Sequence, residues 1–100
     1  MPNIYSGSIT GSAPVQASVG ATSATIVNFN ANRTGLVIVN LSTSTMYFAF
    51  GANAAVVANG IALVPNGGTW TMDEYTFSKE AIQAIAHSAN NIASIQELTV

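Results

Sequence analysis

The sequence predicts an all-β protein, a single small jelly-roll-like β-sandwich of about seven or eight short strands. Val and Ile together number 18 against 4 Leu, and β-branched side chains suit a pleated strand. Short alternating apolar runs recur between clusters of Gly, Pro and Asn. The chain has 100 residues and no Cys, enough for one core without disulfides.

The first part of the chain differs in composition, so we divide the sequence into an extended arm at 1–20 and a sandwich domain at 21–100. The arm is rich in Ser, Gly, Ala and Thr and can bury little per residue. Five apolar side chains are spaced through it and could order the arm on a neighbour: Ile4, Tyr5, Ile9, Val15 and Val19. We select the first four as the predicted partner contacts. The alternative is a frayed tail.

Strand signals follow at short intervals. Ala24–Phe29 alternates, and the Asn- and Gly-containing stretch 30–35 predicts a turn. Leu36–Leu41 is almost entirely apolar, so both of its faces are expected to be covered. Residues 42–45 are expected to form a hairpin loop, and alternate residues of 46–50 then share one face.

A further reversal is predicted at 65–68, between strands at 61–64 and 69–72. Pro fixes φ at the first corner, and the Asn-Gly pair tolerates positive φ. Trp70 and Met72 are expected to face the core, with Thr69 and Thr71 facing outward. The alternation in 93–100 leaves the inward face of the last strand open.

One segment, 79–89, disputes the all-β prediction. Ser78 is a suitable N-cap, and Ile82, Ile85 and Ala86 lie at helical spacing, which by itself favours a short helix. Read as a strand, the same segment places alternate residues from Ile82 to Ala86 on one face. The pattern leaves both possibilities open.

The chain is poor in charge, and this limits its function. Charged residues make up 6%, and the six are Arg33, Asp73, Glu74, Lys79, Glu80 and Glu97. Two cations cannot form a basic face for nucleic acid or a polybasic membrane anchor. The charge-free run from 34 to 72 predicts a surface that packs against copies of the chain or a larger partner. A monomer coated with Ser, Thr and Asn is the alternative.

Candidate catalytic and metal-binding side chains are few. His87 is the only histidine, and no G-x-S-x-G motif marks a nucleophile for it. Asp73 and Glu74 are adjacent at a strand end, where neighbouring side chains point to opposite faces. We therefore expect them to belong to a solvated turn and not to a cation site. We therefore expect no enzyme, no catalytic residue, no cofactor and no metal.

Aromatic side chains offer a second possible kind of site. At strand spacing such a set is more often core, but it could also line a platform for sugars. The set is Tyr47, Phe48, Phe50, Trp70, Tyr75 and Phe77.

Membrane and export signals are weak. The most hydrophobic window, 46–64, is interrupted by two Asn and two Gly and has no flanking cation, so we expect no membrane span. The first residues lack the cationic start and apolar run of a signal peptide.

Several stretches together resemble small virion proteins of tailed bacteriophages, of the capsid decoration, cement or head-fibre type. The resemblance covers about residues 30–100 and consists of strand-and-turn spacing rather than catalytic residues. It is carried by Arg33–Asn40, Tyr47–Gly51, Gly60–Leu63, Gly67–Gly68 with an aromatic before Asp73, and Ala81–Ala86.

The resemblance implies a compact β-sandwich that assembles on the virus particle, often as a homotrimer. It implies a strand for Ala81–Ala86, and on that ground we prefer the strand over the helix. Glu80 stands where such proteins are expected to have a small residue, which leaves that turn open. The N-terminal arm lies outside the resemblance and is our candidate adaptor to a specific partner.

Together these observations predict a non-enzymatic virion protein, made in the host cytoplasm, that decorates or cements a phage capsid. Its partners would be copies of itself and the major capsid protein or another virion protein, with no nucleic acid and no membrane. It would stabilise the shell by bridging neighbouring subunits. The alternative is a tail, head-fibre or host-attachment module that recognises surface glycans.

Overall fold

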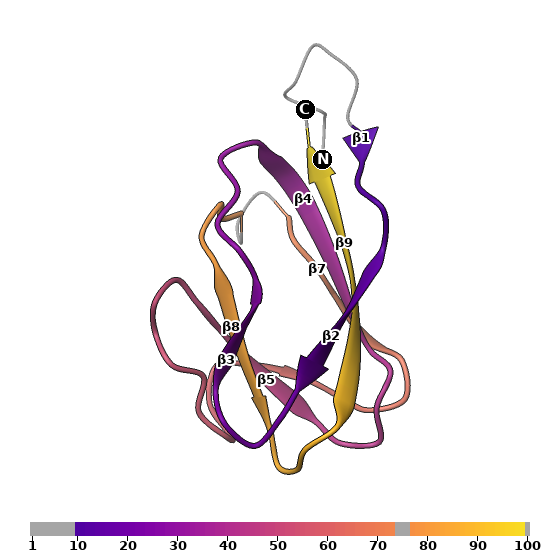
Figure 1. The fold of residues 1–100 in the computed structure, drawn as a ribbon, viewed down its shortest axis with the longest axis vertical. Coiled ribbons are helices and arrows are strands. Elements are labelled where there is room, and N and C mark those ends of the chain that lie inside the picture. The colour runs from indigo at the N-terminus through magenta and orange to yellow at the C-terminus, as the bar shows by residue number, and fades with distance from the viewer. Residues whose placement is uncertain (1–9, 74–76, 100) are drawn as a thin grey trace.

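The computed structural model describes residues 10–73 and 77–99, which form two packed antiparallel sheets and confirm the predicted β-sandwich. Figure 1 shows the two layers, with the long C-terminal strand, in yellow, in the layer on the right. No helix among the described residues is long and apolar enough to cross a membrane. The strands are β1 (Thr10–Gly11), β2 (Val15–Val19), β3 (Ala24–Val27), β4 (Arg33–Asn40), β5 (Met46–Phe50), β6 (Ile61–Leu63), β7 (Gly68–Thr71), β8 (Ile82–Ala86) and β9 (Asn91–Thr99).

The strands alternate between the layers along the chain. Sheet A has the order β1-β9-β4-β7, and β2 also pairs with β9; sheet B has the order β3-β8-β5-β6. Every step from β2 to β9 crosses to the other sheet, except that β5 and β6 are neighbours in sheet B. The two sheets are therefore held together by many short connections at the ends of the sandwich (Figure 1).

The core lies between the sheets and is built from alternate positions of each strand. On β4 and β9 the inward side chains Ile38 and Ile95 are directly opposite each other and buried. The expected shared face of β5 is confirmed, because Met46 and Phe48 are buried and Phe50 packs against the same cluster. Other buried members of the cluster are Val19, Val27, Leu36, Leu63, Met72, Ile82, Ala84, Ala86 and Ala93.

Within the disputed segment 79–89, residues Ile82–Ala86 form strand β8, as the resemblance implied, and the helix that the spacing favoured is wrong. Ile82, Ala84 and Ala86 are buried while the residues between them are half-buried. β8 pairs with β3 on one side and with β5 on the other, so hydrogen bonds to two neighbours replace those of a helix. Tertiary pairing outweighs a local helix preference of a few tenths of a kcal/mol per residue, about the spread of the propensity scale.

The expected hairpin at 42–45 is wrong, because β4 belongs to sheet A and β5 to sheet B. The buried Asn40 side chain directs this crossing. Its amide donates to the Ser44 and Leu63 carbonyls, at 2.8 and 2.9 Å, and its oxygen accepts from the Ser42 backbone N–H at 2.9 Å. Such side-chain bonds to the backbone give the chain a turn that needs no strand pairing.

The second turn, at 65–68, has the predicted backbone, because Asn66 and Gly67 both have positive φ, at 60° and 103°. It too carries the chain across the sandwich, from β6 in sheet B to β7 in sheet A. After it, Met72 is buried and Trp70 is half-buried against the core, in a tilted ring contact with Phe50. Both inward positions were expected from the alternation.

Part of the first twenty residues belongs to the sandwich, although their composition differs from that of the rest of the chain. β2 pairs with β9 over five residues, from Val15 opposite Ile95 to Val19 opposite Asn91. Val19 is only 1% exposed and belongs to the core. Residues 15–19 are therefore part of sheet A, because one well-placed valine and a strand edge suffice to order a stretch of small polar residues.

Candidate interaction surfaces

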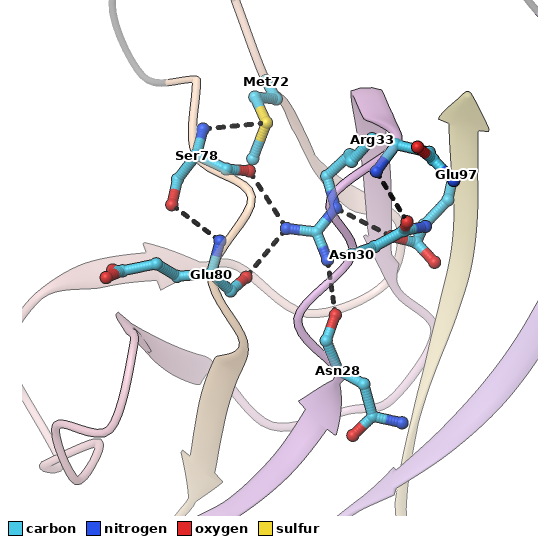
Figure 2. Close-up of polar contacts among 8 residues, drawn as sticks. Asn28, Asn30, Arg33, Met72, Ser78, Glu80 and Glu97 are labelled. Atoms are coloured by element: carbon cyan, nitrogen blue, oxygen red, sulfur yellow. Dashed lines mark hydrogen bonds and ion pairs between the residues drawn. The ribbon is translucent and has the colours of Figure 1, made fainter. Parts of the chain in front are cut away.

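Arg33 begins β4 and forms the main polar site of the interior, at one end of the sandwich (Figure 2). Its guanidinium is 0% exposed and forms an ion pair with Glu97, from Nε to Oε2 at 2.7 Å. Nη1 donates to the carbonyls of Ser78 and Glu80, and Nη2 donates to the carbonyl of Asn28. One side chain thus binds β9 of sheet A and the two segments of sheet B that follow β3 and precede β8.

A β-bulge aims Arg33 inward. Arg33 is opposite Thr99 and Gly35 is opposite Leu98, so Thr34 is an extra residue in β4. An inserted residue changes which side of the sheet the preceding side chains face. The hydroxyl oxygen of Thr34 is buried and has no hydrogen-bond partner among the described residues.

Two aromatic side chains flank this site. Phe29 follows Asn28 and Phe77 precedes Ser78, and the carbonyls of Asn28 and Ser78 both accept from Arg33. A backbone bond from the Asn30 N–H to the Lys79 carbonyl, at 2.9 Å, joins the same two segments. Phe29 is 65% exposed and Phe77 is 38% exposed, so the site holds two exposed aromatics at one end of the sandwich.

The charged residues that the structure describes all lie at this end. We define the Arg33 end by residues 28–33, 72–73, 77–81 and 97–99. Glu97 and Glu80 contact Arg33 directly, Lys79 bonds to Asn30, and Asp73 follows Met72, whose N–H bonds to the Leu36 carbonyl. Glu74 lies outside the described residues. The turns at the opposite end, 20–23, 41–45, 64–67 and 87–90, contain no Asp, Glu, Lys or Arg.

The outer face of sheet A carries no charged side chain among the described residues. It is formed by the outward positions of the two central strands, which alternate with the buried ones. Thr69 and Thr71 extend it on β7, and Gln16 and Ser18 extend it on β2. The six central side chains are Val37, Val39, Ile92, Ser94, Gln96 and Leu98, and each is half-buried.

The outer face of sheet B likewise has no charged side chain within residues 10–73 and 77–99, and the histidine lies at this face. Tyr47 and His87 make an edge-to-face ring contact, with centroids 5.9 Å apart. Thr25 donates to Gln83 at 2.9 Å, and Gln83 donates to the Gly51 carbonyl at 3.0 Å. These bonds fix the strand edges and leave His87 exposed, without a carboxylate or nucleophile bonded to it in the part of the chain that the structure describes.

Of the four predicted partner contacts, the structure describes one. Val15 lies on β2 and is 56% exposed, so its side chain is available to a partner. Ile4, Tyr5 and Ile9 lie outside the described residues. The described residues begin at Thr10, which is opposite Thr99 at the Arg33 end.

The other candidate residues are dispersed. Asp73 is exposed at the Arg33 end, far along the strands from the turn that carries His87. The described residues contain no group of three side chains able to hold a metal ion. Among the aromatics, Phe48 is core, Phe50 and Trp70 pack on the core, and Tyr75 lies outside the described residues, so the described members form no continuous platform.

Sequence reasoning missed the role of Arg33, whose buried side chain makes four hydrogen bonds. No local signal in the sequence marks Arg33 as buried. Strict alternation from the buried Leu36 and Ile38 would place position 33 outward, and only the extra residue Thr34 turns it inward. The partner carbonyls come from distant segments and could not be paired with it by spacing.

Comparisons with known proteins add no family to these observations. No family model, curated protein or solved structure matches the chain. Function is therefore argued from the surfaces described above.

Proposed function

We propose that the protein is a non-enzymatic structural subunit of a tailed-bacteriophage virion that decorates or cements the capsid. The observation that carries the proposal is the confinement of the described charges to the Arg33 end, which leaves two sheet faces and one end uncharged. An uncharged surface rich in hydroxyls and amides suits close packing, where like charges would repel.

The strand order also supports this proposal. Strands β2 to β9 form two sheets in the orders β2-β9-β4-β7 and β3-β8-β5-β6, and every step along the chain except β5 to β6 crosses between them. We infer that this is a jelly-roll winding, an architecture found in viral capsid and lectin domains. The step from fold to function is an analogy, so the evidence for the function must come from the surfaces of the molecule.

The Arg33 end is the proposed contact with the shell. It carries the exposed Phe29 and Phe77, and Val15 and the entry of the N-terminal residues lie toward the same end. Exposed aromatics held in place by a buried guanidinium are suited to bury area against a partner at little cost in conformational entropy. Copies bound across subunit boundaries, as homotrimers, would then stabilise the shell through repeated contacts.

The proposal is tested by mixing the purified protein with empty shells assembled from a candidate major capsid protein. We expect the protein to co-sediment with the shells and to raise their melting temperature. Phe29→Asp should weaken co-sedimentation at least tenfold, whereas Val64→Asp, an equally exposed position at the opposite end, should not. Shells that neither bind the protein nor gain stability, with cells or glycans bound instead, would favour the host-attachment alternative.

A further inference from the structure

We propose that the outer face of sheet A is the surface through which copies of this chain bind one another. The inference rests on the self-association part of the proposed function and names its interface. It concerns the six central side chains of that face, on β4 and β9, and the uncharged side chains on the flanking strands.

The outward positions of the central strands are unusually apolar. A sheet with one face in water normally alternates apolar inward and polar outward residues. On β4 the inward Leu36 and Ile38 alternate with the outward Val37 and Val39, so both faces of this strand are aliphatic. Such a run is typical of a strand that is covered on both sides.

In the part of the chain that the structure describes, only one of these two faces is covered. Sheet B packs on the inner face, and the described residues form two layers with no third layer over sheet A. Outward side chains from β9 extend the aliphatic surface, with Ile92 near one end and Leu98 over Gly35 near the other. A second molecule is therefore needed to supply the missing layer.

Charge and hydrogen-bonding chemistry favour another copy of this chain as that molecule. A carboxylate or ammonium group would repel its own copy across a symmetric contact, but hydroxyls and carboxamides both donate and accept. The polar outward side chains here are Ser94 and Gln96, flanked by threonines on β7. A highly charged partner would lose hydration against these aliphatic side chains and gain no ion pair.

The size of the face fits a contact between two protein chains. Four strands at a spacing of about 4.8 Å span about 19 Å, and the nine residues of β9 span about 30 Å. The accessible area exceeds this projection because side chains protrude from it. A standard interface buries about 800 Å² on each partner, which is of the same order.

The test is a charge placed at the centre of the face. Ser94 lies opposite both Val39 on β4 and Gln16 on β2, and Ser94→Arg removes no apolar contact. We expect the wild-type chain to be oligomeric by light scattering after size-exclusion chromatography. Ser94→Arg should weaken association at least tenfold and shift the mass toward the monomer.

The matched control is Ala49→Arg, a half-buried outward position at the centre of the other sheet, opposite Gln83. It should keep the wild-type mass. Circular dichroism and melting curves check that each variant is folded, and Ser18→Arg, an exposed position on the same face, replaces Ser94→Arg if that variant does not fold.

Two results would overturn the inference: a wild-type chain that stays monomeric at millimolar concentration, or a folded face variant that keeps the wild-type mass. Shell binding is measured separately by co-sedimentation. A monomer that still stabilises shells would refute this interface and leave the decoration role intact. An oligomer that does not bind shells would support this interface and refute the decoration role.

Discussion

At the scale of single residues, three buried polar side chains hold the connections between the strands. Arg33 binds Glu97 and three backbone carbonyls at one end, and Asn40 binds the β4–β5 and β6–β7 connections at the other. Asn91 donates to the Val19 and Ser88 carbonyls and so joins β2 to the β8–β9 turn. Buried polar groups that are fully bonded specify one arrangement of loops, because any other would leave them unpaired.

Replacing Arg33 should be costly. Arg33→Ala removes the donors to the carbonyls of Asn28, Ser78 and Glu80 and leaves Glu97 unpaired. We expect the free energy of unfolding to fall by about 3–5 kcal/mol, the usual cost of breaking a buried pair. Urea denaturation measures this, with Lys79→Ala, exposed at the same end, as a control that should change stability by less than about 0.5 kcal/mol. A loss below about 1 kcal/mol for Arg33→Ala would contradict the assigned role.

At the scale of elements, pairing between distant segments decides what each segment becomes. β8 has helical spacing but lies between β3 and β5, where its backbone groups pair on both sides. β2 is poor in apolar residues but completes the edge of sheet A along β9. In both cases the neighbouring strand supplies the hydrogen bonds that the local sequence does not specify.

A matched pair of substitutions tests whether β2 belongs to the core. Val19→Ala should reduce the free energy of unfolding by roughly 1.5–3 kcal/mol, since Val19 is 1% exposed. Val15→Ala, on the same strand but 56% exposed, should change it by less than about 0.5 kcal/mol. Equal small effects from both, measured by urea denaturation, would show that residues 15–19 detach from sheet A in solution.

At the scale of the whole molecule, the sandwich has two unlike ends and two uncharged outer faces. The described charges gather around Arg33, whereas the turns at the other end hold only uncharged side chains, with Leu41 and Val64 exposed among them. The molecule is therefore asymmetric along the strand direction, and its two ends are suited to different surroundings.

This asymmetry predicts how self-association responds to salt. Because the outer face of sheet A holds no charged side chain among the described residues, its contact should be insensitive to screening. Raising the salt to about 1 M, where the Debye length is about 3 Å, should change the dissociation constant by less than about threefold. Sedimentation equilibrium measures it, and a weakening of tenfold or more would show that charged residues at the Arg33 end form the contact instead.

The sequence predicted much of the architecture and little of the interaction surface. Alternation in 46–50 placed Met46, Phe48 and Phe50 on one face, and alternation in 69–72 identified Met72 as inward. The Asn-Gly pair marked a turn with positive φ. The connection at 42–45 was mistaken for a hairpin because a short polar loop looks the same whether it joins strands of one sheet or of two. Of the predicted partner contacts only Val15 can be placed, and it is exposed.

By itself, the sequence determined that the chain forms strands, that they suffice for one core, and that few charges are available. Those properties depend on composition and on the period of apolar residues along the chain. Only the tertiary structure decided which strands are neighbours, which face of β9 is inward, and that Arg33, Lys79, Glu80 and Glu97 meet at one end. The reason is that these residues are up to 64 positions apart, and a separation of that size becomes a contact only through strand pairing and packing.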